Sequence, residues 1–152
     1  MDEEFDFDYT EDPKLSVERF EEMIRNKDQY FFDSQAFESI VDFYMDKNDP
    51  VKALEVIEYA VSQHPYAAIF FIKQAQLYVF TNELSKAFVA LEKAELLEPS
   101  EADIFMIRGN VYESLEQHEK ALENLLQALE LAEVQDEVLM QIAYVHENMG
   151  DY

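Results

Sequence analysis

The sequence contains no cysteine, only two glycines and only four prolines in 152 residues. Without cysteine the protein has no disulfides, no thiolate nucleophile and no thiolate metal site. The scarcity of glycine and proline leaves few turn signals for a protein made of β-strands, and it favours nearly continuous helix. Hydrophobic residues make up 49% of the chain and aromatic residues 14%, which is enough for the packed core of one domain.

Basic residues are also scarce, since 11 Lys and Arg stand against 34 Asp and Glu, for a formal net charge of -23. Such a surface repels nucleic-acid phosphates and anionic membranes, so we expect neither as a partner, and it favours a basic partner. An acidic surface that only keeps the protein in solution is the competing interpretation. Because no signal-peptide pattern and no run of 18 apolar residues occur, the sequence predicts a cytoplasmic location.

Patterns typical of catalysis, cofactor binding or metal binding are absent from the sequence. Gly109 and Gly150 are too far apart to form a phosphate-binding loop. The three histidines lack zinc-like spacing; we expect His64 and His118 to be exposed polar residues and His146 to be packed at the end of the repeats. We therefore expect a protein that is not an enzyme, with no catalytic residue, no cofactor and no metal site.

The residue pattern repeats with a period of 34 residues. This step relates Ala53, Ala87 and Ala121; Ala60, Ala94 and Ala128; Phe37, Phe71 and Phe105; and Tyr44, Tyr78 and Tyr112. A unit of this length cannot bury its own apolar face, so successive units must stack into a continuous core. The small, helix-favouring alanines let paired helices approach closely. The sequence therefore predicts an all-α solenoid.

Each unit resembles the tetratricopeptide repeat. The shared pattern is an aromatic at position 4, a small residue at 8, Tyr at 11, Ala at 20, a large apolar residue at 24, Ala at 27 and Pro at 32. The third unit supplies Phe105, Gly109, Tyr112, Ala121, Leu125 and Ala128. The first unit departs from the pattern with Val41 at the small position, which predicts looser or wider packing there. The resemblance implies a right-handed superhelical solenoid of antiparallel helix pairs.

On this basis the chain divides into six segments. They are an acidic N-terminal tail (1–12), a capping helix with a connector (13–33), three repeats (34–67, 68–101 and 102–135) and the first half of a fourth repeat (136–152). The tail is expected to be flexible, or else docked in a groove through Phe5, Phe7 and Tyr9. The fourth repeat is expected to be truncated, unless its single helix serves as the cap.

Eight helices are expected within these segments. Their predicted ranges are 13–26, 34–47, 51–63, 67–81, 84–97, 101–115, 118–132 and 136–148. The clearest start lies at Asp49, the predicted N-cap, with Pro50 at the first helical position. Asn48 before it tolerates a left-handed backbone conformation.

In the resembled family, positions 2, 5, 6, 9, 12 and 13 of each unit line a concave groove. The candidate partner site drawn from these positions comprises Ile69, Ile72, Lys73, Gln76, Val79, Phe80, Met106, Ile107, Asn110, Met140 and Tyr144. Some family members hold the terminal carboxylate of a heat-shock chaperone with a clamp of Lys, Arg and Asn. That clamp is largely missing here, since Lys73 is the only cation at these positions and Glu38 and Asp42 stand where the clamp needs Lys and Asn.

The remaining groove positions form an apolar strip bordered by acids, which fits a protein or peptide segment that is apolar with basic flanks. The competing interpretation is that the strip is apolar only because it is buried. We therefore expect a non-enzymatic protein–protein interaction scaffold that binds a partner segment in the groove. The alternative is a structural or assembly module, a homo-oligomer that covers its apolar groove and open C-terminal end with copies of the same chain.

Overall fold

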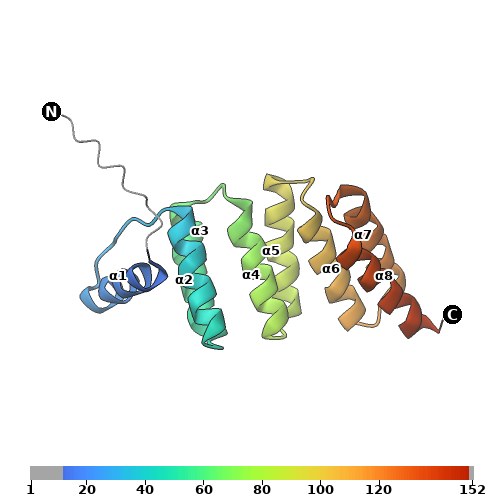
Figure 1. Cartoon of the computed structure of the whole chain (residues 1–152), viewed down its shortest axis with the longest axis horizontal. Coiled ribbons are helices and arrows are strands. Elements are labelled where there is room, and N and C mark those ends of the chain that lie inside the picture. Colours follow the sequence, from blue (N-terminus) through green and yellow to red (C-terminus); the bar gives the residue numbers. More distant parts are fainter. Residues whose placement is uncertain (1–11, 151–152) are drawn as a thin grey trace. The chain divides into compact units, whose positions relative to one another are not determined.

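The structure is a computed structural model that describes residues 12–150, and this part of the chain consists of helices without strands (Figure 1). The helices are α1 (Pro13–Asn26), α2 (Ser34–Asp46), α3 (Pro50–Gln63), α4 (Ala68–Phe80), α5 (Leu84–Leu97), α6 (Ala102–Ser114), α7 (His118–Leu131) and α8 (Asp136–Met149). The eight predicted helices are confirmed, each with bounds that agree to within one residue. Apart from Asp12, the predicted N-terminal tail lies outside the described residues.

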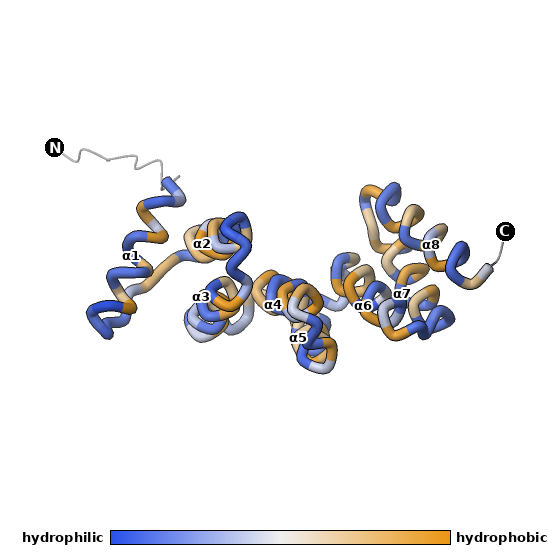
Figure 2. Tube along the Cα trace, turned by 90° about the horizontal axis from the view of Figure 1, so that it is seen from below, coloured by the Kyte–Doolittle hydropathy of each residue, from blue (hydrophilic) through white to orange (hydrophobic). Residues whose placement is uncertain are grey.

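The helices belong to two compact units, one ending at Pro65 and the other beginning at Tyr66. In the first unit, α1 packs on α2 and α2 packs on α3. In the second unit, α4 pairs with α5 and α6 pairs with α7, while α6 also contacts α4 and α5, and α8 contacts α6 and α7. Hydrophobic and hydrophilic residues are interspersed along the helices in Figure 2, as expected where each helix buries only part of its surface.

The core of the first unit joins α1 to the first repeat through aromatic side chains. Phe20, Phe32 and Phe37 are all buried, with ring centroids 6.2 Å apart for the first two and 5.3 Å apart for the last two. The connector that carries Phe32 is held by Gln63 at the end of α3. The Gln63 amide donates to the Tyr30 carbonyl oxygen at 2.7 Å and accepts from the Phe32 N–H at 3.0 Å. These two bonds satisfy backbone groups of an otherwise irregular segment.

A polar bond also links α1 to α2. The Tyr44 hydroxyl donates to Glu21 Oε1 at 3.0 Å. Burial of the phenol, together with the hydrogen bond and negative charge of Glu21, raises the pKa of Tyr44 far above its ordinary value. The phenol therefore keeps its proton, and this bond, throughout the neutral pH range.

The three histidines differ from their predicted settings. His64 is half-buried, because the connector lies against it: its Nε2 is 2.7 Å from the Phe32 carbonyl oxygen and its ring contacts Phe31. His118 is also half-buried, with Nδ1 2.9 Å from Glu113 Oε2. His146, expected to be packed, is exposed on α8. The predictions for all three are therefore wrong, since neighbouring segments and not the local sequence decide which histidines are covered.

The turn between paired helices has the same geometry in all three repeats. The residues with positive φ are Asn48 at 56°, Asn82 at 58° and Glu116 at 58°. In each turn the next residue donates its N–H to the carbonyl oxygen of the repeat tyrosine: Asp49 to Tyr44, Glu83 to Tyr78 and Gln117 to Tyr112. Asp49 also caps α3 by accepting from the Lys52 N–H at 3.0 Å. The predicted helix start at Asp49 and Pro50 is thus confirmed, together with the left-handed Asn48.

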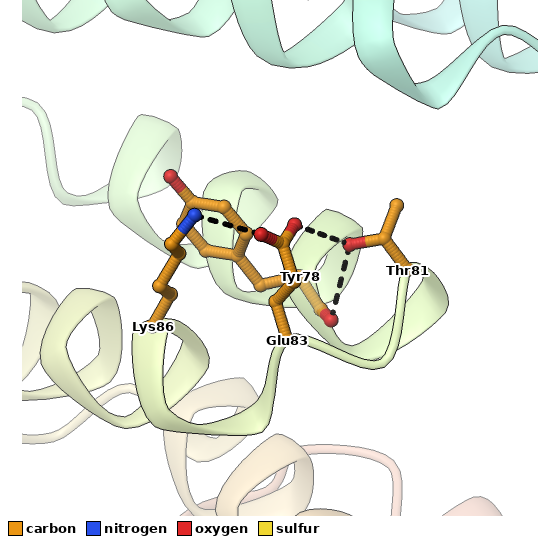
Figure 3. Close-up of polar contacts among 4 residues, drawn as sticks. All are labelled: Tyr78, Thr81, Glu83 and Lys86. Carbon is orange, nitrogen blue, oxygen red and sulfur yellow. Dashed lines mark hydrogen bonds and ion pairs between the residues drawn. The ribbon is translucent and has the colours of Figure 1, made fainter.

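Figure 3 shows how side chains support the second of these turns. Lys86 Nζ lies 2.7 Å from Glu83 Oε1, and the Thr81 hydroxyl donates to Glu83 Oε2 at 2.9 Å. The hydroxyl has one hydrogen, so the 3.4 Å contact with the Tyr78 carbonyl oxygen is the weaker alternative. The ion pair with Lys86, followed by the bond from Thr81, lowers the pKa of Glu83.

Small residues set how closely the paired helices approach. An added Cβ at Gly109 would lie 2.8 Å from Leu125 Cγ and 3.3 Å from the Ala121 carbonyl oxygen, which leaves no room for a side chain. In α2 the equivalent position is held by Val41, which is buried. The looser or wider packing predicted from Val41 stays a prediction.

Candidate partner-binding groove

The second unit contains a cavity of about 390 Å³ whose lining comes from α4, α6 and α8. The lining residues are Gln76, Val79, Asp103, Met106, Ile107, Asn110, Glu137 and Gln141. Each of them occupies position 2, 5, 6, 9 or 12 of its repeat. The cavity is therefore built from one face of the first helix of each of three successive repeat units.

The spacing of the α6 residues explains why one helix supplies half of the lining. Asp103, Met106, Ile107 and Asn110 stand at i, i+3, i+4 and i+7, which places them on one face of the helix. Other faces of α6 carry the buried side chain of Phe105 and the close-packed Gly109. Gly109 faces Leu125 of α7, and the face with the four spaced residues is left to line the cavity.

The charge of the lining is entirely negative. Asp103 and Glu137 are related by the 34-residue step, so they occupy equivalent positions on α6 and α8, and both are exposed. Within residues 12–150 neither carboxylate forms an ion pair, and no Lys or Arg belongs to the lining. The nearest arginine in sequence, Arg108, binds Glu95 at 2.7 Å. The cavity therefore carries negative charge without a compensating cation.

Gln141 belongs to this lining but carries an unsatisfied acceptor that has no accessible surface in the cavity. Its Oε1 atom is buried, and no donor among the described residues forms a hydrogen bond with it. A buried carbonyl-type oxygen without a donor costs about 1–3 kcal/mol.

Comparison with known proteins identifies the fold to which this groove belongs. Residues 102–135 match the family model described as the tetratricopeptide repeat. The chain has the tetratricopeptide repeat fold. The resemblance predicted from the repeat positions is thus confirmed. No curated protein sequence matches the chain.

Solved structures of tetratricopeptide repeat proteins share this architecture. The first tetratricopeptide domain of Spaghetti (RPAP3), bound to the HSP90 peptide SRMEEVD, has 18% identity and a TM-score of 0.69, covering 80% of this chain and 99% of that one. A thermophilic tetratricopeptide repeat protein from Thermus thermophilus, TTC0263, has 23% identity and a TM-score of 0.72, covering 91% and 75%. The Sgt2 domain from Aspergillus fumigatus has 18% identity and a TM-score of 0.70, covering 78% and 80%. At these sequence identities, the similarity to the solved structures shows a shared fold only.

The cavity between α4, α6 and α8 is lined by five of the residues proposed from sequence. These are Gln76, Val79, Met106, Ile107 and Asn110. The other six do not line it: Ile69, Ile72, Lys73, Phe80, Met140 and Tyr144. Ile72 is buried, so for this residue the competing interpretation of the strip as core applies. Phe80, Met140 and Tyr144 are 59%, 72% and 57% exposed and extend the apolar surface of α4 and α8 beyond the cavity.

The lining also contains three polar residues that the sequence-based site omitted, namely Asp103, Glu137 and Gln141. That site gave weight to apolar side chains, although positions 2 and 6 of the tetratricopeptide repeat point to these residues equally well. Asp103 and Glu137 share position 2, and Gln141 takes position 6. The signal that finds them is the repeat period itself, applied to polar residues as well as apolar ones.

Neither a metal centre nor a membrane-spanning segment emerges from the described part of the chain. Within residues 12–150, no three His, Asp or Glu side chains gather where they could hold a metal ion. In the same range, every helix is too short or too polar to cross a membrane.

Proposed function

We propose that the protein is a non-enzymatic interaction module whose second unit binds a segment of a partner protein in the groove between α4, α6 and α8. The observation that carries this proposal is the cavity itself, lined by groove positions of three successive repeats. Its lining includes no histidine, lysine, serine, threonine or tyrosine, and its two carboxylates are exposed, which suits binding better than nucleophilic or acid–base chemistry. The peptide bound to the RPAP3 domain supports a peptide occupant for this fold.

The chemistry of the lining favours a partner segment with both apolar and basic residues. Val79, Met106 and Ile107 provide apolar surface, while Asp103 and Glu137 provide negative charge. Apolar anchors in a groove supply most of the affinity, and complementary charge gives specificity. The peptide of the RPAP3 complex, SRMEEVD, is itself acidic, and like charges would disfavour it here. A basic and apolar segment is the better match for this chain.

Substitutions placed inside and outside the groove test this function. Peptides selected from a displayed random library on the immobilised full chain would be labelled and measured by fluorescence anisotropy. Met106→Glu is expected to weaken binding at least about tenfold, since it places a charge on the apolar part of the cavity lining. Lys73→Ala is expected to leave the affinity nearly unchanged.

The control is Leu126→Glu, which adds the same charge to an exposed leucine of α7, outside the cavity lining. It is expected to bind the peptides as the parent chain does. Peptides that bind Met106→Glu and the parent equally would place the site elsewhere. Loss of binding with Lys73→Ala alone would restore recognition of a terminal carboxylate.

A second candidate function is self-assembly through α8. Leu139 occupies position 4 of its repeat and is 48% exposed, whereas the equivalent Phe71 and Phe105 are 8% and 9% exposed. Met140 and Tyr144 of α8 are exposed as well. We propose a second copy of the chain as the occupant of this apolar surface.

A further inference from the structure

We propose that Glu113 is a positioning residue of the groove, because its carboxylate joins the last turn of α8 to both α6 and α7 and so sets how far α8 stands from α6. We call Glu113, His118 and Asn148 the clasp. This inference rests on the proposed function, since α8 supplies Glu137 and Gln141 to the cavity lining.

Both oxygens of the Glu113 carboxylate have a partner on another helix. Asn148, in the last turn of α8, donates an Nδ2–H to Oε1 at 2.6 Å. His118 is the first residue of α7, and its Nδ1 lies 2.9 Å from Oε2. An Nδ1–H is present in the charged ring and in one neutral tautomer, so the imidazole can donate in either charge state. One carboxylate thus connects three helices.

The burial of Glu113 makes these two bonds necessary. Its side chain is only 10% exposed, in contrast to the exposed carboxylates of the cavity lining. Burial of a carboxylate is unfavourable unless hydrogen-bond donors replace the lost water, as the two donors do here. Loss of a donor, or a second negative charge beside the first, leaves a buried charge uncompensated. We expect α8 then to move away from α6 until water reaches the carboxylate.

The repeat pattern does not account for this link between the helices. Glu113 takes position 12 and Asn148 position 13 of successive repeats. The equivalent pair one repeat earlier is Val79 on α4 and Ser114 on α6. The valine side chain has no polar atom, and the serine hydroxyl donates within α6 to the Asn110 carbonyl oxygen at 3.0 Å. The clasp is therefore a property of the junction between α6 and α8.

Apolar packing contributes little at this end of α8. Residues 146–149 are exposed. A cavity of about 400 Å³ lies beside them, lined by Met149 and by residues 116–120 at the start of α7. Helix ends with few buried contacts open easily. The bond from Asn148 is therefore what we expect to hold the last turn of α8 against α6.

The clasp acts on the groove through the tilt of α8. The segment before this helix is held by the Gln135 side chain, which donates to the Leu129 carbonyl oxygen at 3.0 Å. A helix of 14 residues transmits a displacement as a nearly rigid element. With both ends fixed, the distances of Glu137 and Gln141 from α6 are fixed as well. Loss of the clasp should therefore distort the cavity that these residues line and weaken binding.

The test compares a variant that breaks the clasp with one that restores it, in the full chain. Asn148→Asp places a second carboxylate against Glu113. It should raise the hydrogen–deuterium exchange rates of α8 amides several-fold and weaken the peptides selected by display several-fold. Combining it with Glu113→Gln exchanges donor and acceptor, because the new amide can donate to the new carboxylate and still accept from His118. The double variant should return both quantities to within about twofold of the parent.

Further variants complete the comparison. Asn148→Ala removes the donor without adding charge and should change both quantities less, in the same direction. Glu113→Gln alone completes the double-mutant cycle. Gln127→Glu is the matched control, because it adds a carboxylate at an exposed position of α7 and should change neither quantity. Circular dichroism melts establish that each variant is folded at the temperature of measurement.

The outcomes separate this inference from the proposed function. Exchange rates that Asn148→Asp leaves unchanged, or a double variant that stays as impaired as Asn148→Asp, would overturn the clasp. Altered and rescued exchange with unchanged peptide affinity, while Met106→Glu still weakens binding, would refute a positioning role in the groove. Peptides that ignore Met106→Glu would count against the groove function itself, and the exchange rates would still decide whether Glu113 holds α8.

Discussion

Backbone conformation at three single residues makes the three turns alike. Asn48, Asn82 and Glu116 stand 34 residues apart and share a left-handed conformation. Asparagine tolerates this region because its short side chain bonds locally, whereas most L-residues pay about 1–2 kcal/mol for it. Glu116 therefore bears a conformational cost that the first two turns avoid.

Replacing this residue should stabilise the protein. Glu116→Asn is expected to raise the free energy of unfolding by about 0.5–1 kcal/mol and the melting temperature by a few degrees, because asparagine accepts the positive φ. Differential scanning calorimetry measures the change. The reciprocal variant Asn82→Glu should lower the melting temperature by a similar amount. A Glu116→Asn protein that melts no higher than the parent would contradict the strain at this position.

Among the helices, the sequence best predicts the buried alanines that recur every 34 residues, which we call the alanine ladder. Ala53, Ala87 and Ala121 are fully buried, and the helix bounds follow the repeat period closely. Local signals suffice here because Ala at a fixed step, or Asp before Pro, determines helix position without distant partners. The two hydrogen bonds between the Gln63 side chain and the connector could not be predicted in this way, because they join residues about thirty positions apart.

The ladder has a measurable consequence for the second helix pair. Ala87→Leu should overpack the contact between α4 and α5 and lower the free energy of unfolding by roughly 1–3 kcal/mol, since the position has no exposed surface. Ser85→Leu adds a similar side chain near the same helix start at an exposed position and should cost much less. Urea titrations followed by circular dichroism compare the two. Equal unfolding midpoints would mean that Ala87 is not at the tight contact.

The groove illustrates where prediction from sequence ends. The repeat period indicates which positions face the groove, and the cavity lining consists of such positions only. The repeat period alone cannot show that Ile72 is buried, that Phe80 lies outside the cavity, or that Gln141 Oε1 has no donor. These properties depend on how α4, α6 and α8 pack, and hence on side chains from three repeats at once.

For the complete chain, the negative charge and the uncovered face of α8 act in opposite directions on self-association. A net charge of -23 makes copies of the chain repel each other, most strongly at low salt. Apolar surface on α8, including Leu139, Met140 and Tyr144, favours contact. Burial of even about 400 Å² of apolar area contributes on the order of 10 kcal/mol before the entropy of association is subtracted. Association through α8 should therefore strengthen as salt screens the charge.

Sedimentation velocity at low and high salt tests this balance over a range of protein concentrations. If the second candidate function holds, the parent chain should associate more at high salt, and Leu139→Glu should abolish the effect by placing a charge on the uncovered face. Leu96→Glu is the matched control, because Leu96 is an exposed leucine of α5 that lies away from α8. Association that Leu139→Glu leaves unchanged, or that Leu96→Glu removes equally, would exclude α8 as the contact. A parent chain that stays monomeric under all conditions would leave the groove of the second unit as the surface on which function depends.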